Sequence, residues 1–173
     1  MRWVAAVGLI GAGLALAGCG SGTVPGTADP EAVASGEPAF SPCDDVPPDA
    51  LHAVGVDPST SERDIDGVKQ PGWNRCRWAG TDHSLTVFAT TRTWDEIRGN
   101  DRNTDLIDQQ INGRDVMVYR ESTDVRGERC DVAFRAGDGA SIVRVSLYNP
   151  ERSGDPCELA VHTATALEGA IPK

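Results

Sequence analysis

Apolar and polar positions alternate along several short segments of the chain, with the period of two that is typical of half-buried β-strands. These segments are residues 74–78, 85–90, 114–119, 129–135 and 141–148, and they are rich in β-branched or aromatic side chains. Gly137-Asp138-Gly139 lies between the last two, and Asn112-Gly113 precedes the third, so both places carry residues that hairpin turns favour. The pattern predicts about five strands joined by short turns.

Three other segments have helical patterns. A short helix is expected to start near Pro47 and end near Gly55, and a second is expected after Thr93, whose side chain can cap it. The third starts at Asp155-Pro156, an N-cap followed by proline at the first helical position, and runs to about Gly169. Its apolar side consists of Cys157, Ala160, Val161, Ala164 and Leu167. We expect an α+β fold, in which an antiparallel sheet of about five strands has helices packed on it.

The first residues have the pattern of an export signal. Arg2 supplies a positive start, and residues 4–17 are only apolar residues and glycine, a run shorter than the roughly twenty residues that a membrane-spanning helix needs. Leu16-Ala17-Gly18-Cys19 resembles the bacterial lipobox, in which two small residues precede the cysteine that receives a diacylglyceryl group. We expect cleavage before Cys19, acylation of its thiol and stable attachment to a membrane. The alternative is an ordinary secretory signal that happens to end near a cysteine.

The sequence therefore divides into a lipoprotein signal peptide (residues 1–18), a lipidated cysteine with a flexible tether (19–39) and a globular α+β domain (40–173). Residues 20–39 are mostly small, polar or proline, and none of them is aromatic. Such a composition buries too little apolar surface to fold by itself. The alternative is an arm that is ordered against the domain.

The net charge is −10. A surface this negative repels a phosphate backbone, so the charge excludes nucleic acid as an expected partner.

Four cysteines remain once Cys19 is assigned to lipid: Cys43, Cys76, Cys130 and Cys157. An even number in an extracytoplasmic domain predicts two disulfides, and no pair has the spacing of a thiolate metal site. Sequence order alone allows three connectivities. Cys157 and Cys130 are both expected to point into one interface between the last helix and the sheet. This favours a 130–157 bridge and leaves Cys43 to meet Cys76.

The sequence has few candidates for catalysis or metal binding. His52, His83 and His162 have no ligand or triad partner at a typical spacing, and a nucleophile-elbow motif is absent. Asp64-Ile65-Asp66-Gly67 has only the beginning of a calcium-loop pattern, which favours a solvated turn. We therefore expect no catalytic residues, no metal and no cofactor.

Three tryptophans are candidates for lining a ligand cleft. They are Trp73, Trp78 and Trp94, and core packing is the interpretation that we favour for them in a domain with few aromatics. Trp73 follows Pro71-Gly72 and is expected to be the most exposed of the three. The sequence indicates no other ligand-binding residues.

Several short motifs suggest a family. A lipobox and tether lead into Phe40-Ser41-Pro42-Cys43, then a helix ends near Val54-Gly55-Val56, and Cys76-Arg77-Trp78 and a late cysteine before the last helix follow. Together they resemble the actinobacterial lipoproteins of the domain of unknown function 3558 family over most of residues 40–173. A polar stretch at residues 60–71 departs from the pattern. The resemblance implies an envelope protein with a PsbP-like sheet-and-helix fold, and it brings no enzymatic activity.

These observations lead to one functional expectation and two alternatives. We expect a non-enzymatic lipoprotein, anchored on the outer face of the cell membrane, that binds a partner protein or an amphiphilic envelope ligand. One alternative is a cell-envelope hydrolase, and the other is a structural accessory subunit of a transporter or sensor.

Overall fold

The structure, a computed structural model, describes residues 36–173. The predicted signal peptide, the predicted lipidation site Cys19 and most of the predicted tether lie outside the described residues. Within residues 36–173, no helix has the length and hydropathy needed to span a bilayer.

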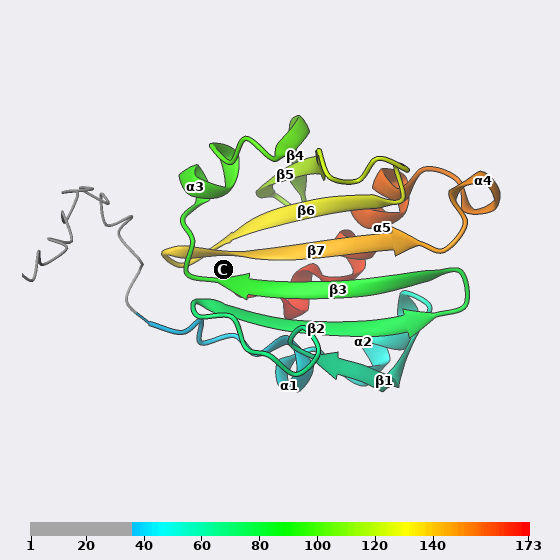
Figure 1. Cartoon of the computed structure of the whole chain (residues 1–173). Helices are drawn as coiled ribbons and strands as arrows, with labels where there is room; N and C mark the ends of the chain where they lie inside the picture. Colours follow the sequence, from blue (N-terminus) through cyan, green and yellow to red (C-terminus); the bar gives the residue numbers. More distant parts are fainter. Residues whose placement is uncertain (1–35) are drawn as a thin grey trace, which may run out of the picture. The chain divides into compact units, whose positions relative to one another are not determined.

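Seven antiparallel strands form one sheet in the order β1-β2-β3-β7-β6-β5-β4 (Figure 1). Strands that are neighbours in the chain pair as hairpins in β1–β2–β3 and in β4–β5–β6–β7, and the pairing of β3 with β7 joins the two groups. The bounds are β1 (Val56–Arg63), β2 (Trp73–Gly80), β3 (His83–Thr90), β4 (Asn103–Ile111), β5 (Arg114–Glu121), β6 (Arg129–Ala136) and β7 (Gly139–Leu147).

The helices are few and short. Among the described residues only α5 is longer than six residues. The bounds are α1 (Pro42–Asp45), α2 (Pro48–Ala53), α3 (Trp94–Arg98), α4 (Pro150–Ser153), α5 (Pro156–Leu167) and the 3₁₀ helix η1 (Glu168–Ala170).

The expectation of about five strands with helices packed on them, in a PsbP-like arrangement, is wrong. The molecule is mostly one seven-stranded sheet, and the two strands that the sequence pattern missed, β1 and β4, are its edges. An edge strand has only one neighbour and need not bury alternate side chains. After Val56, β1 is polar, and β4 is largely exposed until Ile111.

Irregular pairing at both edges also disrupts the period-two pattern. The register shifts between Asp57 and Glu62 in β1, and between Thr104 and Ile107 in β4, where Asp105 has a φ of 54°. Such bulges bend an edge strand and discourage pairing with another chain.

Both predicted hairpin turns are confirmed. Asn112 and Gly113 have φ values of 50° and 83° between β4 and β5, which is the geometry that favours this pair of residues. Gly137 has a φ of 57° between β6 and β7. The predicted N-caps are confirmed as well, because Thr93 accepts a hydrogen bond from the Glu96 amide and Asp155 accepts one from the Cys157 amide.

One face of the sheet packs against α5, α1 and α2, and Figure 1 shows α5 lying across the strands on this side. The side chains that meet there alternate along each strand, as a half-buried sheet requires. Fully buried members of this core include Trp78, Leu85, Val132, Phe134, Val143, Val145, Ala160, Ala164 and Leu167.

Two disulfides fasten helices to this face. The structure joins Cys43 to Cys76 and Cys130 to Cys157, which is the pairing that the sequence favours. The first ties α1 to β2, and the second ties α5 to β6. By the chain-entropy account, closing loops of this length stabilises the domain by about 3.5 kcal/mol per bridge.

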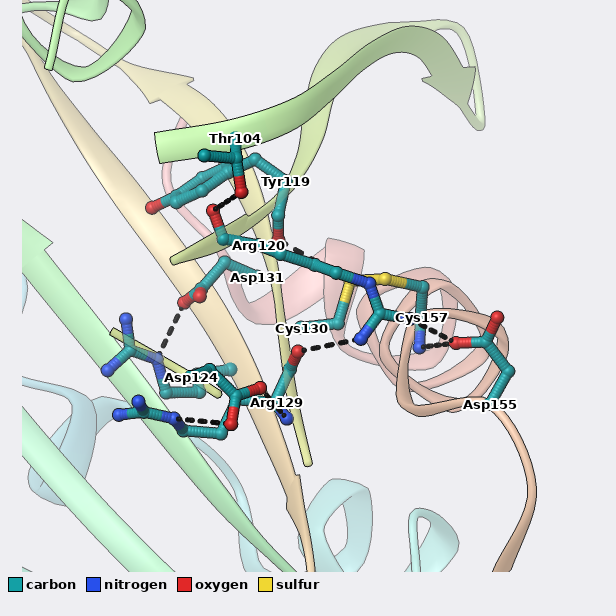
Figure 2. Close-up of a disulfide and its surroundings, with 10 residues drawn as sticks. Thr104, Tyr119, Arg120, Asp124, Arg129, Cys130, Asp131, Asp155 and Cys157 are labelled. Atoms are coloured by element: carbon teal, nitrogen blue, oxygen red, sulfur yellow. Dashed lines mark hydrogen bonds and ion pairs between the residues drawn. A yellow bond between two sulfur atoms is a disulfide. The ribbon is translucent and has the colours of Figure 1, made fainter. Parts of the chain in front are cut away.

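Two arginines of β5 hold the ends of α5 to the sheet. At its start, Arg120 donates to Asp155 at 2.8 Å beside the Cys130–Cys157 bridge (Figure 2). At its end, Arg114 donates to Glu168 at 3.1 Å and to the carbonyl oxygens of Ile171 and Pro172 at 3.0 and 2.6 Å. Helix α5 is therefore fixed at both ends.

Candidate ligand-binding groove

A half-open groove of about 1080 Å³ lies on the sheet face opposite α5. Its floor comes from β2, β3, β7 and β5, and its walls come from two connections, residues 64–71 and 92–103. The volume slightly exceeds the range of roughly 300–1,000 Å³ that is typical of small-molecule sites. The groove is therefore large enough to hold a ligand of considerable size.

Strand register places the floor residues side by side. Arg75 is paired with Phe88, and Phe88 with Ile142, so their side chains form one row across β2, β3 and β7. Trp73 meets the edge of Phe88 with ring centroids 6.1 Å apart, and the Arg144 guanidinium lies over the Phe88 ring at 5.2 Å. Trp73, Phe88 and Ile142 thus form an aromatic, apolar strip, and the cationic side chains of Arg75 and Arg144 lie beside it.

The wall at residues 64–71 lies within the polar stretch, residues 60–71, at which the sequence departs from the pattern that it otherwise resembles; residues 60–63 of that stretch belong to β1. Ile65 and Val68 pair in a small β-bridge around the turn at Asp66-Gly67, whose φ values are 51° and 74°. Both apolar side chains line the groove and are 51% and 60% exposed. The segment is a tight turn as expected, and it also gives the groove an apolar rim.

The second wall is α3 and the chain that follows it. A capping box between Thr93 and Glu96 starts this helix, and Arg92 pairs with Glu96 at 3.0 Å. Ile97 is buried in a cluster with Met117, Tyr119 and Ile142, and the Asn103 amide donates to the Ile97 carbonyl at 2.7 Å. These contacts fix the wall against the open face.

Arg144 is held by two carboxylates at the floor. Its Nε donates to Asp131 Oδ1 at 2.8 Å, and its Nη2 lies 2.8 Å from Glu121 Oε1. Asp131 is fully buried on β6, opposite Tyr119 of β5 (Figure 2). The second carboxylate oxygen of Asp131 has no hydrogen-bond partner among the described residues.

Burial controls the protonation of this network. Desolvation raises the pKa of the Asp131 carboxyl to about 6, while the neighbouring Arg144 limits the rise. Desolvation also raises the pKa of the Tyr119 hydroxyl above its usual value, and the Asp131 charge adds to that effect. Tyr119 therefore lines the groove as a neutral phenol.

Arg75 differs from Arg144 in its partners. Its Nη1 donates to the backbone carbonyl of Asp64, and no carboxylate of residues 36–173 lies within 4 Å of its guanidinium nitrogens. Desolvation lowers the pKa of the Arg75 guanidinium, Glu62 opposes that effect, and Arg77 and Arg144 add to it. The groove thus contains a partly buried cation whose charge is not neutralised by a described ion pair.

The structure separates the three tryptophans considered for a cleft. Trp78 belongs to the core under α5, and Trp94 packs in the smaller cluster of the open face. Only Trp73, which the sequence predicts to be the most exposed, lines the groove.

The histidines lie elsewhere. His52 on α2 and His162 on α5 are exposed, whereas His83 is buried at the start of β3. Within the described chain, no hydrogen bond joins a histidine side chain to a serine or a carboxylate, and no cluster of three metal-ligating side chains occurs.

Sequence reasoning missed most of the groove. Arg75, Phe88, Ile142 and Arg144 alternate with core residues on their strands, and this marks them as facing away from α5. The pattern does not reveal that the connections at residues 64–71 and 92–103 flank these side chains. Those connections lead from β1 and into β4, the two edge strands that the sequence pattern did not predict.

Fold and groove together define a class: a disulfide-bonded domain built on one antiparallel sheet, with one face covered by helix and the other carrying an open groove. The family described as Protein of unknown function (DUF3558) matches residues 14–170, so the chain belongs to this family. No curated protein matches the chain, and neither does any solved structure.

The raised pKa of the Asp131 carboxyl predicts how the stability of the protein depends on pH. An aspartate in an unfolded chain has a pKa of about 3.9. Because the pKa of Asp131 is about 6 in the folded protein, the folded state binds a proton more tightly between these values, and stability falls as the pH rises through this range. We therefore expect the free energy of unfolding of the wild type, relative to Asp131→Asn, to rise by on the order of 2 kcal/mol from about pH 7 to about pH 4.

Urea unfolding at each pH measures this difference. Asp138→Asn, at the exposed β6–β7 turn, controls for the change in net charge. If the wild type instead loses stability relative to Asp131→Asn as the pH falls, the prediction is contradicted. That result would mean that attraction to Arg144 lowers the pKa of Asp131 by more than burial raises it.

Proposed function

We propose that the protein is a non-enzymatic lipoprotein, attached through Cys19 to the outer face of the cell membrane, and that its domain binds an amphiphilic envelope ligand in the groove. The actinobacterial envelope is the setting that the family resemblance suggests. The observation that carries the binding proposal is the groove itself, in which an aromatic strip lies between cationic side chains.

The anchor proposal is supported by the lipobox and by the extent of the family match. The match begins at residue 14, so it includes Cys19 and the small residues before it. Two disulfides in a small domain are typical of an oxidising, extracytoplasmic environment.

The start of the domain supports a link between anchor and groove. Glu37 pairs with Lys69 at 3.2 Å, and the Asn74 amide donates to the carbonyls of Pro38 and Phe40 at 2.9 and 2.8 Å. The chain therefore enters the domain beside the wall that carries Ile65 and Val68. A groove at this position is close to the tether that connects the domain to the membrane.

Binding is favoured over catalysis by the groups that line the groove. Its charged side chains are arginines and carboxylates, several of them paired with each other, and no histidine or cysteine is among its lining residues. Paired charges and aromatic rings suit recognition of a ligand with one apolar and one polar end.

The anchor is tested by the intact mass of the protein purified from the membranes of its native host. We expect a chain that begins at acylated Cys19 and that gains the mass of four hydrogen atoms on reduction, because two disulfides open. Cys19→Ser is the matched control and is expected to lack the acyl mass. An unacylated wild-type chain would contradict the anchor.

Ligand binding is tested by tryptophan fluorescence of residues 20–173, which contain all seven strands, both disulfides and both apolar clusters. We expect dodecyl maltoside, below its micelle concentration, to shift the emission of Trp73 in a saturable way, because an alkyl chain replaces water at this ring. Trp73→Phe should remove the shift, since Trp78 and Trp94 are buried. A wild-type spectrum that does not change would contradict binding in the groove.

A further inference from the structure

We infer that the ligand of the groove is an anionic amphiphile, whose oxyanion headgroup binds Arg75 and whose apolar chain lies along Trp73 and Phe88. This inference rests on the proposed function and names the ligand class for the same groove.

Removing a charge from water costs free energy. A guanidinium that loses part of its hydration is stable only if other groups replace the lost interactions. Arg75 is partly buried in the groove, and within residues 36–173 its guanidinium donates to one backbone carbonyl, that of Asp64. A guanidinium has five N–H donors, so Arg75 keeps donors for an oxyanion.

The other arginines of the groove do not offer the same site. Arg144 is paired with Asp131 and Glu121, and Arg92 is paired with Glu96. Arg102 has no ion pair among residues 36–173, but it is exposed on the wall that follows α3. Arg75 is therefore the cation of the floor that an incoming anion can neutralise, and Arg102 can approach the same anion from the rim.

Strand register sets the distance between the charged and apolar parts of the site. Arg75, Phe88 and Ile142 are direct neighbours across three strands, so a headgroup on Arg75 is adjacent to the aromatic strip. Trp73 and the exposed side chains of Ile65 and Val68 flank the same floor. One molecule with an anionic end and an alkyl chain fits this order of groups.

Arginine pairs with phosphate, sulfate and carboxylate through parallel hydrogen bonds, so the shared chemistry of the headgroup is an oxyanion. A net charge of −10 on the whole protein makes an anion an unfavourable partner except where a local cation attracts it. Selection for an anion must therefore depend on Arg75.

The test compares three probes with the same alkyl chain on residues 20–173: dodecyl phosphate, dodecyl maltoside and dodecyltrimethylammonium, each below its micelle concentration. Trp73 fluorescence and calorimetry report the affinities. We expect dodecyl phosphate to bind roughly tenfold or more tightly than dodecyl maltoside, because a charge-assisted hydrogen bond contributes that much. The cationic probe should bind most weakly.

Arg75→Gln is expected to abolish the preference for dodecyl phosphate over dodecyl maltoside. Arg77→Gln is the matched control. Arg77 lies two residues along the same strand and on the same face, is paired with Glu62 at 3.5 Å and does not line the groove. This variant should keep the wild-type preference.

The other outcomes distinguish failure of this inference from failure of the proposed function. Binding of all three probes with equal affinity, or a preference that survives in Arg75→Gln, would overturn the inference and leave the proposed function intact. Failure of every probe to bind would overturn both. Inorganic phosphate that binds as tightly as dodecyl phosphate would also overturn the inference, because the apolar floor would then contribute nothing.

Discussion

The attachment of α5 to one face of the sheet is the interaction on which the rest of the structure depends. A single sheet has two faces, and this one buries a continuous core only where α5, α1 and α2 cover it. The Cys130–Cys157 bridge, Arg120 and Arg114 hold α5 at both ends. On the opposite face α3 packs on the smaller apolar cluster, and the groove is formed beside it.

The open face is stabilised by a different kind of packing. Its smaller apolar cluster lies under α3, and beside it the buried Asp131 and Glu121 neutralise Arg144. Breaking such a pair would leave a buried charge without compensation, which costs several kcal/mol. Arg144 thus completes the floor of the groove and is already satisfied. The partly buried Arg75 is not, and this contrast between two neighbouring arginines is the basis for assigning an anionic ligand.

Local chemistry in the sequence was enough to predict the hairpin turns, the N-caps at Thr93 and Asp155, and the five inner strands. It also favoured the disulfide pairing, because Cys130 and Cys157 each carry a directional signal in their own element. The edge strands were not predictable in this way, since β1 and β4 are polar, bulged and paired on one side only. The groove was missed for the same reason. Its walls are the connections next to these edges, and its floor residues are marked only by alternation with the core.

We propose that ligand binds on the open face of the sheet and not on the face that α5 covers. Methyl resonances in residues 20–173, followed by NMR during titration with dodecyl phosphate, test it most directly. Ile142 and Val143 are adjacent in β7 and point to opposite faces. The account predicts shifts at the methyl groups of Ile65, Val68 and Ile142, and none at Val143 or Leu167. Shifts centred on Val143 and Leu167 would contradict it.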